Sequence, residues 1–303
     1  MSYRVVFIEN EVNISVKLNN LVIQKQEGDI WIPIEDISMI VLDNLKIRLS
    51  VRMLSLLAEY NVSVVLCDRK HLPIGFNSSY DNHSRISKYI GYQIKAEQQT
   101  YDEIWRQIVE HKLKNQASVL KILGKNLSAA DHILEFAMSV LPGDPHNREA
   151  HGAKVYFNTL MNSTFSRGNE DILLNSGLDY GYAIMRSYIA RLCVGYGLNS
   201  QIGIHHRNEY NRFNLIDDLI EPVRPIVDLH AYRLLQDKKF FRIEERRSLV
   251  NIVNHKIEYK KKKMYLGNAL EEYVSSYAAL LAGRNAEMTF PDVMLYSGEE
   301  DEI

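Results

Sequence analysis

Short β-prone runs fill the first part of the chain, up to about residue 67. Apolar side chains at every second position from Val12 to Leu18 have the two-residue period of a half-buried strand. The turn residues Asn19-Asn20 and Gly28-Asp29 separate neighbouring runs, as in β-hairpins. The predicted strands are Tyr3–Ile8, Val12–Leu18, Leu21–Gln24, Ile30–Ile34, Ile37–Leu42 and Val62–Cys67.

A helical period appears at Ser50–Tyr60 and dominates after about residue 95. From Ile104 to Leu123 apolar residues recur every three or four positions and form one long amphipathic stripe. Further helices are predicted at Ala129–Val140, Asn147–Leu160, Tyr180–Gly195, Asp228–Gln236, Glu244–Lys263 and Leu266–Ala282. The pattern predicts an α+β protein in which a small N-terminal β-rich domain precedes a larger, all-helical domain.

The change of period also predicts the domain boundaries. Residues 1–95 form the β-rich domain, with a polar, turn-rich linker from about residue 68. Residues 96–284 form the helical domain. Residues 285–303 end in a run of acidic side chains and are expected to be a flexible tail.

Composition and charge exclude several classes of protein. The net charge of −2 over 303 residues gives no global attraction to nucleic acid, so a DNA-binding surface requires local clustering of the 36 basic residues. The two cysteines, Cys67 and Cys193, fit neither a disulfide framework nor a cysteine-type zinc site. No apolar stretch reaches the roughly 18 residues of a membrane span, and the first residues lack the apolar run of a signal peptide. We expect a cytoplasmic protein with no membrane partner.

Residues 203–228 carry the densest chemistry in the chain. The segment GIHHRNEYNRFNLIDDLIEPVRPIVD places two histidines and several carboxylates around a glutamate that precedes a proline. Burying such groups together costs free energy unless a metal or a substrate compensates for their lost hydration. The segment therefore predicts a metal site that acts on phosphate, with Glu149 as a further ligand from elsewhere in the chain.

The same acids also have simpler explanations. Glu149 follows Asn147 at the start of a predicted helix, where it would complement the helix dipole with Asn147 as the cap. Asp218 and Glu221 have the spacing of a capping box, although Pro222 would clash in the first turn of such a helix. Of the adjacent histidines, His205 is the weaker candidate, since lone histidines are more often structural.

Four segments resemble, in the same order, those of the CRISPR-associated integrases, the Cas1 family. They are IPIEDISMIVLDN at 32–44, NREAHGAKVYFNTL at 147–160, LDYGYAIMRSYIAR at 178–191, and the histidine-to-acid block at 203–228. The resemblance extends over most of residues 1–284. Its motifs are most like those of members found beside the Cas9-type effector.

The resemblance implies a metal site and its ligands. Glu149, His206 and Glu221 match the family's metal-binding triad residue by residue, and Asp218 matches an auxiliary acid. The cofactor is expected to be Mg²⁺ or Mn²⁺, because carboxylate oxygens suit both ions and manganese tolerates one imidazole better. The 57 positions between Glu149 and His206 mean that tertiary packing must assemble the site.

Several basic and aromatic residues near these motifs are candidates for DNA contact. Arg207, Arg212, Arg224 and Lys154 are expected to bind phosphates. Tyr180 and Tyr182 are expected to stack on a base at the DNA end, with core packing as the alternative. The lysine run at 260–263 is either a phosphate-binding patch or a solvated helix face.

The resemblance also implies an activity and an assembly. The implied activity is metal-dependent cleavage and joining of DNA, in which 3′-hydroxyls attack phosphodiesters of a CRISPR repeat to insert a new spacer. The implied partners are double-stranded DNA, a second copy bound through the N-terminal domain, the Cas2 protein, and the Cas9-type effector with other adaptation proteins. The aliphatic run Ile37–Leu42, which a small β domain is expected to leave partly uncovered, fits such a dimer. An inactive DNA-binding scaffold of the same fold and an unrelated metal-dependent phosphodiesterase are the alternatives.

Overall fold

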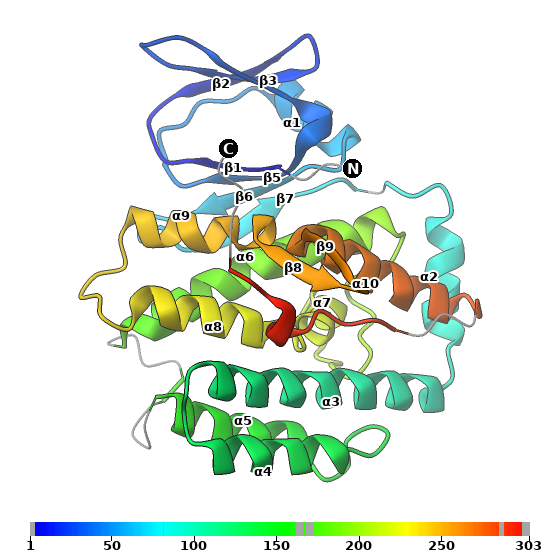
Figure 1. Ribbon diagram of the computed structural model, residues 1–303. Coiled ribbons are helices and arrows are strands. Elements are labelled where there is room, and N and C mark those ends of the chain that lie inside the picture. Colours follow the sequence, from blue (N-terminus) through cyan, green and yellow to red (C-terminus); the bar gives the residue numbers. More distant parts are fainter. Residues whose placement is uncertain (1–3, 81, 162–165, 168–171, 285–287, 299–303) are drawn as a thin grey trace.

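The N-terminal part of the chain folds into two small sheets with a helix, as predicted (Figure 1). The computed structural model describes residues 4–80, 82–161, 166–167, 172–284 and 288–298. One sheet has the strand order β1-β5-β6-β7 and the other the order β2-β3-β4. Their bounds are β1 Arg4–Ile8, β2 Asn13–Lys17, β3 Asn20–Gln24, β4 Ile30–Pro33, β5 Ile37–Leu42, β6 Ser63–Cys67 and β7 Pro73–Asn77, with helix α1 at Val51–Glu59.

Strand β5 is an inner strand of the first sheet and is buried on both faces. It pairs in parallel with β1 and β6, and all six of its residues are buried. Met39 and Val41 pack into the core of the helical part, while Ile37 and Ile40 pack with α1 and the second sheet. This continuous apolar run is therefore a buried parallel strand. The prediction that Ile37–Leu42 is left partly uncovered was wrong.

The helical part lies below the sheets in Figure 1, with the long helix α3 running across the molecule above α4 and α5. Helices α6 and α9 lie nearest the sheets, and α8 lies between these and α3. The bounds are α2 Ile86–Lys95, α3 Gln98–Ile122, α4 Leu127–Met138, α5 Arg148–Leu160, α6 Leu173–Gly195, α7 Asn214–Ile220, α8 Arg224–Leu235, α9 Ile243–Asn251 and α10 Leu266–Leu281. Short 3₁₀ turns lie at Ile34–Asp36, Ile252–Asn254 and Val293–Leu295.

The helical part also contains a β-hairpin, so the predicted all-helical domain was partly wrong. Helix α9 ends at Asn251, and the chain then forms β8 Lys256–Tyr259 and β9 Lys262–Tyr265, where one long helix was expected. Lys260 and Lys261 make the turn with positive φ values of 49° and 63°. Two-residue hairpin turns need this conformation and usually take it from Asn or Gly, so two lysines gave no turn signal. The explanation of the lysine run as a solvated helix face was therefore wrong.

The expected linker contains two ordered elements. Strand β7 pairs antiparallel with β6 at the edge of the first sheet. Helix α2 packs with the helical part, where the Gln93 side-chain amide donates to the carbonyls of Asn199 and Ile202 at 3.1 and 3.2 Å.

Helix α6 begins at Leu173, seven positions before its predicted start. A Cβ at Gly177 would lie 2.3 Å from Leu235 Cδ1, so this glycine serves close helix packing.

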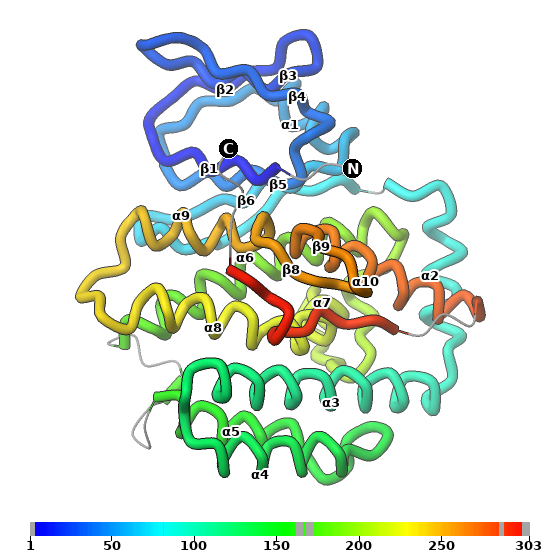
Figure 2. The backbone as a smooth tube through the Cα atoms, viewed as in Figure 1, coloured from blue at the N-terminus to red at the C-terminus, as the bar shows by residue number. Residues whose placement is uncertain are grey.

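Residues 288–298, which we call the C-terminal strap, pack along α3 and correct the expectation of a flexible tail. In Figure 2 the strap crosses the helical part between α3 and α8. Val293 is fully buried, and Met288 and Tyr296 are 7% and 6% exposed. Asn115 on α3 donates to the Pro291 carbonyl at 3.0 Å and accepts from the Val293 amide at 3.1 Å. The acidic end at 299–303 lies outside the described residues.

Among the described residues, no helix is both long enough and apolar enough to cross a membrane.

Candidate functional site

The site is built where helices α3 and α5 approach each other closely. Gly152 on α5 faces α3, and a Cβ at this position would lie only 2.1 Å from Leu113 Cδ2. Leu113 follows Lys112 on α3, and Gly152 lies less than one helical turn after Glu149. The glycine therefore lets the two helices come close enough for Lys112 to reach Glu149.

Glu149 lies in the first turn of α5, but its carboxylate does not serve as a helix cap. Asp144 caps this helix instead, since its two carboxylate oxygens accept from the amides of Arg148 and Glu149 at 2.9 and 3.0 Å. Asn147 has a left-handed backbone and makes no side-chain cap. The Glu149 carboxylate accepts a hydrogen bond from Lys112 Nζ. Asn147 is therefore not the predicted cap, whereas Glu149 does lie in the first turn of α5 and also forms an ion pair with α3.

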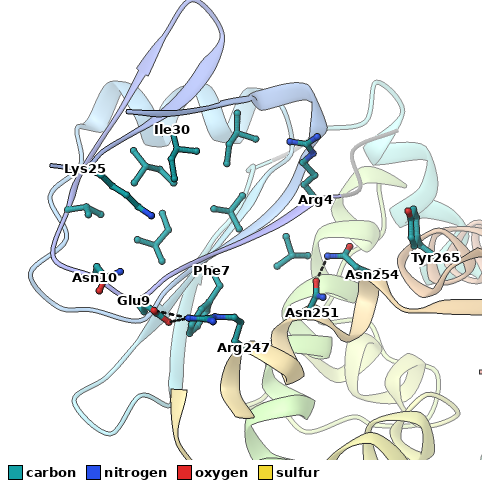
Figure 3. Close-up of a pocket in the computed structure, with 16 residues that line it drawn as sticks. Arg4, Phe7, Glu9, Asn10, Lys25, Ile30, Arg247, Asn251, Asn254 and Tyr265 are labelled. Carbon is teal, nitrogen blue, oxygen red and sulfur yellow. Dashed lines mark hydrogen bonds and ion pairs between the residues drawn. The ribbon is translucent and has the colours of Figure 1, made fainter. Parts of the chain in front are cut away.

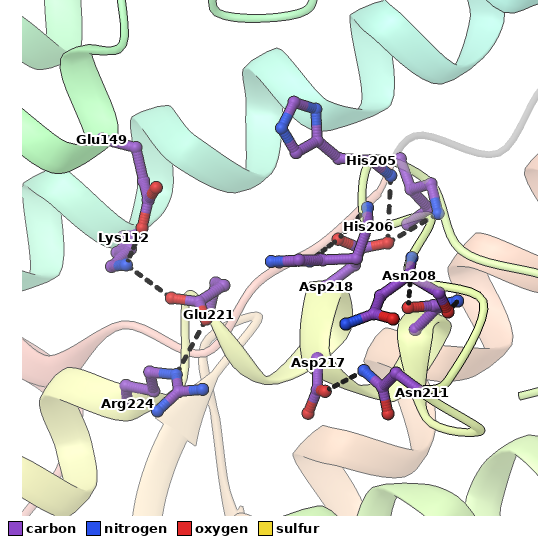
Figure 4. Close-up of polar contacts among 12 residues, drawn as sticks. Lys112, Glu149, His205, His206, Asn208, Asn211, Asp217, Asp218, Glu221 and Arg224 are labelled. Atoms are coloured by element: carbon purple, nitrogen blue, oxygen red, sulfur yellow. Dashed lines mark hydrogen bonds and ion pairs between the residues drawn. The ribbon is translucent and has the colours of Figure 1, made fainter. Parts of the chain in front are cut away.

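Glu221 follows the short helix α7 and is held by two cations. Lys112 Nζ donates to its Oε2 at 2.5 Å, and Arg224 Nε donates to its Oε1 at 2.8 Å. Glu221 is only 7% exposed. It is the C-cap residue of α7, so a capping box with Asp218 at the start of a helix is wrong. Figure 4 shows Lys112 between the two glutamates and Arg224 on the far side of Glu221.

Asp218 organises the turn that carries the two histidines. Its buried carboxylate accepts from the backbone amides of Ile204, His205 and His206 at 2.6, 3.0 and 3.2 Å, and from His206 Nδ1 at 2.5 Å. A Cβ at Gly203 would lie 3.0 Å from Asp218 Oδ2 and closer still to the His206 carbonyl, so only glycine fits there. In Figure 4 the His206 ring extends from Asp218 toward the side where Lys112 and Glu221 lie.

Trp105 on α3 packs against the two histidines of this turn. Its ring stacks on His205 with centroids 4.3 Å apart and nearly parallel planes, and it meets the edge of His206 at 5.9 Å. Trp105 is 3% exposed, so its position is fixed by the core. The His205 ring is thereby packed against an aromatic ring and turned away from Asp218, which agrees with His205 being the weaker candidate of the two histidines.

The charges of the site hold one another in their ionised forms. The hydrogen bond to Asp218 raises the pKa of His206 above its ordinary value. Burial acts to raise the pKa of Glu221, but the nearby Lys112 and Arg224 outweigh it and lower this pKa. Burial acts to lower the pKa of Lys112, but Glu221 and Glu149 outweigh it and raise this pKa. The structure thus places two carboxylates on one ammonium, with an imidazole on the adjoining turn.

The donor set suits a hard divalent cation. Two carboxylates from α5 and the end of α7 already meet on a cation, and Asp218 holds Nδ1 of His206, so Nε2 is the ring nitrogen that could bind a metal. Within the part of the chain that the structure describes, no three His, Cys, Asp or Glu side chains converge closely enough to ligate one ion. The ammonium of Lys112 lies between the carboxylates instead.

The predicted phosphate-binding residues lie at different distances from this centre. Arg207 and Arg212 are exposed on the loop around His206, and Lys154 is exposed on α5. A groove of about 440 Å³ opens beside His206 and is lined by Arg207, Gln98 and neighbouring residues. Arg224 is tied to Glu221, and its guanidinium lies 4.5 Å from the centre of the Tyr182 ring.

Tyr180 and Tyr182 do not face solvent, and the structure contradicts their predicted base-stacking role. Tyr180 is fully buried, with its ring against Phe241. Tyr182 is 9% exposed, and its hydroxyl donates to the buried carboxylate of Asp228. Both rings belong to the core, which was the alternative explanation.

Three important residues escaped the reasoning from sequence. Lys112 and Asn115 lie on the buried side of α3, and Trp105 was counted only as an apolar residue of the helix. Lys112 lies four positions after Ile108 and three after Val109, where the stripe requires an apolar side chain. A charged residue at that position was the signal that could have identified it.

A second cavity lies away from these residues, between the N-terminal sheets and α9 (Figure 3). Its volume is about 480 Å³, and it is lined by apolar residues of the sheets, such as Phe7 and Ile30, with Lys25 at its edge. Arg247 on α9 donates to both carboxylate oxygens of Glu9 at 2.8 and 2.9 Å across one side. None of the predicted site residues lines this cavity.

The fold matches that of DNA-processing proteins of known structure. A casposase bound to its integration product superposes with a TM-score of 0.76 at 19% identity, covering 100% of this chain and 96% of the casposase. A chain of a Cas6-RT-Cas1–Cas2 complex superposes with a TM-score of 0.71 at 16% identity, covering 99% of this chain and 36% of that one. The class of fold is therefore the one shared by Cas1 proteins and the casposase.

The amino-acid sequence then assigns the family. Residues 5–252 match the model of the CRISPR associated protein Cas1. The CRISPR-associated endonuclease Cas1 of Neisseria meningitidis serogroup C (strain 8013) is 32% identical over 298 residues, which is 97% of each chain. The chain belongs to the Cas1 family, and the resemblance inferred from its four motifs is confirmed.

Proposed function

We propose that this protein is a metal-dependent DNA endonuclease and integrase that inserts foreign DNA fragments into a CRISPR array as new spacers. In this reaction a DNA 3′-hydroxyl attacks a phosphodiester of the repeat. The observation that carries the proposal is the meeting of Glu149 and Glu221 on one cation, with His206 on the adjoining turn. The relative from Neisseria, named as an endonuclease, and the casposase bound to its integration product support it.

Glu149, Glu221 and His206 would hold Mg²⁺ or Mn²⁺. The bound ion would neutralise charge on the reacting phosphate. Asp218 accepts from His206 Nδ1 and so directs the other ring nitrogen outward, and Arg224 fixes the Glu221 carboxylate. An inactive scaffold of the same fold would not require these supports, which favours the enzyme.

DNA is the proposed substrate and is expected to enter along the groove beside His206. Arg207 and Arg212 on the loop, with Lys154 on α5, are the proposed phosphate-binding residues. Since the net charge is −2, binding depends on such local clusters. Replacing any one of these three side chains by alanine is expected to reduce the slope of log affinity against log salt by about 0.9.

The proposed assembly is a homodimer that binds the Cas2 protein and, through it, a second dimer. The solved complex of Cas1 with Cas2 supports the Cas2 partner. Because β5 is covered within one chain, its aliphatic residues no longer argue for the dimer. Trp31 and Ile30, 44% and 39% exposed on β4, are apolar residues that the N-terminal part does present. Contact with the Cas9-type effector rests on the family motifs alone.

A strand-transfer assay tests the activity. A duplex with free 3′-hydroxyls is incubated with a repeat-containing target and the Cas2 partner, with and without Mn²⁺. We expect products only with the metal, and a decrease of at least about a hundredfold in rate for Glu149→Ala, His206→Ala and Glu221→Ala. Double variants should be no slower than single ones, because each substitution disables the same cation site.

His205→Ala is the matched control for His206→Ala. The two histidines are adjacent, but His205 stacks on Trp105 and does not bond Asp218 through its ring. We expect this control to retain activity within about tenfold of the wild type. Full activity in any one of the three alanine variants would remove that residue from the site, and activity in EDTA would contradict a metal-dependent reaction.

A further inference from the structure

Lys112 occupies an unusual position for a lysine. It is 6% exposed and lies among fully buried apolar residues of α3, including Val109 and Leu113. Removing an ammonium group from water is costly unless charged partners replace its hydration. The partners of Lys112 must therefore account for its presence in the core.

Two carboxylates provide that compensation. Lys112 Nζ donates to Glu149 from α5 and to Oε2 of Glu221 beyond α7. The second oxygen of Glu221 is held by Arg224 at 2.8 Å. Without the ammonium of Lys112 between them, the carboxylates of Glu149 and Glu221 would repel each other, because like charges at short range repel.

The same two carboxylates are the acidic ligands of the proposed metal. A divalent ion binds carboxylate oxygens at about 2.0–2.6 Å. An ammonium bonded to both carboxylates occupies the same region, because its nitrogen lies at 2.5 Å from one of those oxygens. The ion and the ammonium cannot both lie at the meeting point of the two side chains.

We propose that Lys112 is a resident counter-cation of the site: it holds Glu149 and Glu221 together in the metal-free protein, and a divalent ion must displace it in order to bind. The displacement of Lys112 by a metal rests on the proposed function, whereas its role of holding the two glutamates together in the metal-free protein does not. The residue is a positioning group for the two ligands and a tethered competitor of the metal. The four-carbon stem of lysine allows the ammonium to move away while the backbone of α3 stays in place.

Metal binding tests the competition. Lys112→Met keeps the length and apolar volume of the side chain and removes its charge. Binding of Mn²⁺ to the full chain is measured from the electron paramagnetic resonance signal of the free ion. We expect Lys112→Met to bind Mn²⁺ at least about tenfold more tightly than the wild type, because the competing cation is gone. Equal or weaker binding would overturn the proposed displacement.

Lys114→Met is the matched control. Lys114 lies on the same helix, but it is 46% exposed and pairs with Glu110 at the surface. The substitution removes the same charge from the same helix without touching the two glutamates. It should leave the affinity for Mn²⁺ unchanged, and a similar gain in this variant would reduce the effect to net charge and overturn the proposal.

Stability in EDTA tests the metal-free role independently. Lys112→Met should lower the melting temperature in EDTA, because it removes the cation that lies between the carboxylates of Glu149 and the buried Glu221. The same substitution in a Glu149→Gln/Glu221→Gln background should cause no such decrease, since no repulsion remains. The triple variant should fold even if Lys112→Met alone does not. An equal decrease in both backgrounds would overturn the counter-cation role.

These measurements separate the two proposals. If the wild type with Mn²⁺ shows no strand transfer, the proposed function fails, while the EDTA comparison still decides the role of Lys112. If strand transfer is present and the EDTA comparison shows no coupling between Lys112 and the glutamates, the inference about Lys112 fails alone.

Discussion

The role of each buried or partly buried acidic residue in this protein depends on the groups that surround it. Glu149 and Glu221 share an ammonium, whereas Asp218 accepts four N–H groups of the histidine turn. Asp228 is also buried, but its bonded partner is the hydroxyl of Tyr182. Glu149 and Glu221 are paired with a charged group, whereas Asp228 is paired with a neutral hydroxyl. The pKa of the buried Glu221 is therefore lowered by its cations, whereas burial raises the pKa of Asp228.

The pH dependence of stability should reveal Asp228. Burial raises its pKa from 3.8 to about 6, so the folded state holds this proton more tightly than the unfolded state. The contribution of Asp228 to the free energy of unfolding therefore falls as pH rises through this range. Asp228→Asn removes the titration. We expect the stability of the variant relative to wild type to increase by about 2 kcal/mol between about pH 4.5 and about pH 7.

Chemical denaturation at both pH values measures this difference. Asp131→Asn is the control, since the Asp131 side chain is 66% exposed. A flat difference for Asp228→Asn would mean that the buried carboxylate keeps an ordinary pKa.

At the scale of single residues, the motifs predicted a set of metal ligands but not the residues that contact them. The ligand set Glu149, His206 and Glu221 followed from the motifs, and the structure places Glu149 and Glu221 on one cation. Lys112 and Asn115 could not be assigned from their own neighbourhood, because their partners lie 107 to 178 positions away except for Glu149, which lies 37 away. Local periodicity contains no information about such contacts.

At the scale of elements, strands and helices with strong apolar periodicity were predicted correctly, whereas a hairpin with a weak turn signal was missed. Strand β5 was predicted at its true bounds, and the predicted stripe from Ile104 ends within one residue of α3 but starts six positions after it, because only the apolar part of the helix is regularly spaced. The hairpin β8–β9 was missed because its turn is made by Lys260 and Lys261. Helix α2 was missed because polar, turn-rich residues precede it, although Ile86, Tyr89 and Ile90 recur at helical spacing.

The contact between α3 and α5 is expected to depend on Gly152. Gly152→Ala adds helix propensity worth about 1 kcal/mol, but its methyl group would overlap the fully buried Leu113. Overpacking of this kind costs about 1–3 kcal/mol. We expect a net decrease in stability of about 1 kcal/mol, and slower strand transfer because α5 moves the proposed ligand Glu149 away from Glu221.

Gly91→Ala provides the matched comparison for thermal unfolding. Gly91 is also inside a helix, but a Cβ there would meet no atom within 4 Å. This substitution should stabilise the protein by about 0.5–1 kcal/mol. If both variants were stabilised, the close approach of α3 and α5 would not depend on the glycine.

At the scale of the whole molecule, polar contacts tie the β-rich and helical parts together. The buried carboxylate of Asp43, at the end of β5, accepts from Arg246 on α9 at 2.9 Å and bonds His71 at 2.8 Å. Arg191 on α6 donates to the carbonyl of Asn61 at 2.7 Å. With the shared core at Met39 and Val41, these contacts hold the two parts in one arrangement.

The C-terminal strap is expected to be necessary for activity, although a flexible tail was predicted at 285–303. Removing residues 288–303 would expose the pocket of Val293 and leave Asn115 without two of its partners. Asn115 also donates to the Pro222 carbonyl at 2.8 Å, directly after Glu221. We expect the truncated chain to be several kcal/mol less stable and to lack most of its strand transfer.

Thermal unfolding and the strand-transfer assay measure both effects. Met294→Ala is the control, because Met294 belongs to the same strap but is 58% exposed. It should differ from the wild type by less than about 0.5 kcal/mol. Full activity in the truncated chain would show that α3 holds the Pro222 turn without help from the strap.

The strap also bears on how a newly synthesised chain acquires its activity. Asn115 contacts Pro291, which leaves the ribosome 176 residues later. The N-terminal sheets contain their own core and can fold while synthesis continues. Asn115, which donates to the carbonyl next to Glu221, gains its full set of partners only after residue 293 has been added. A polypeptide released before that point would carry a folded β-rich part beside an unfinished candidate site, so under the proposed function partial translation products would be inactive.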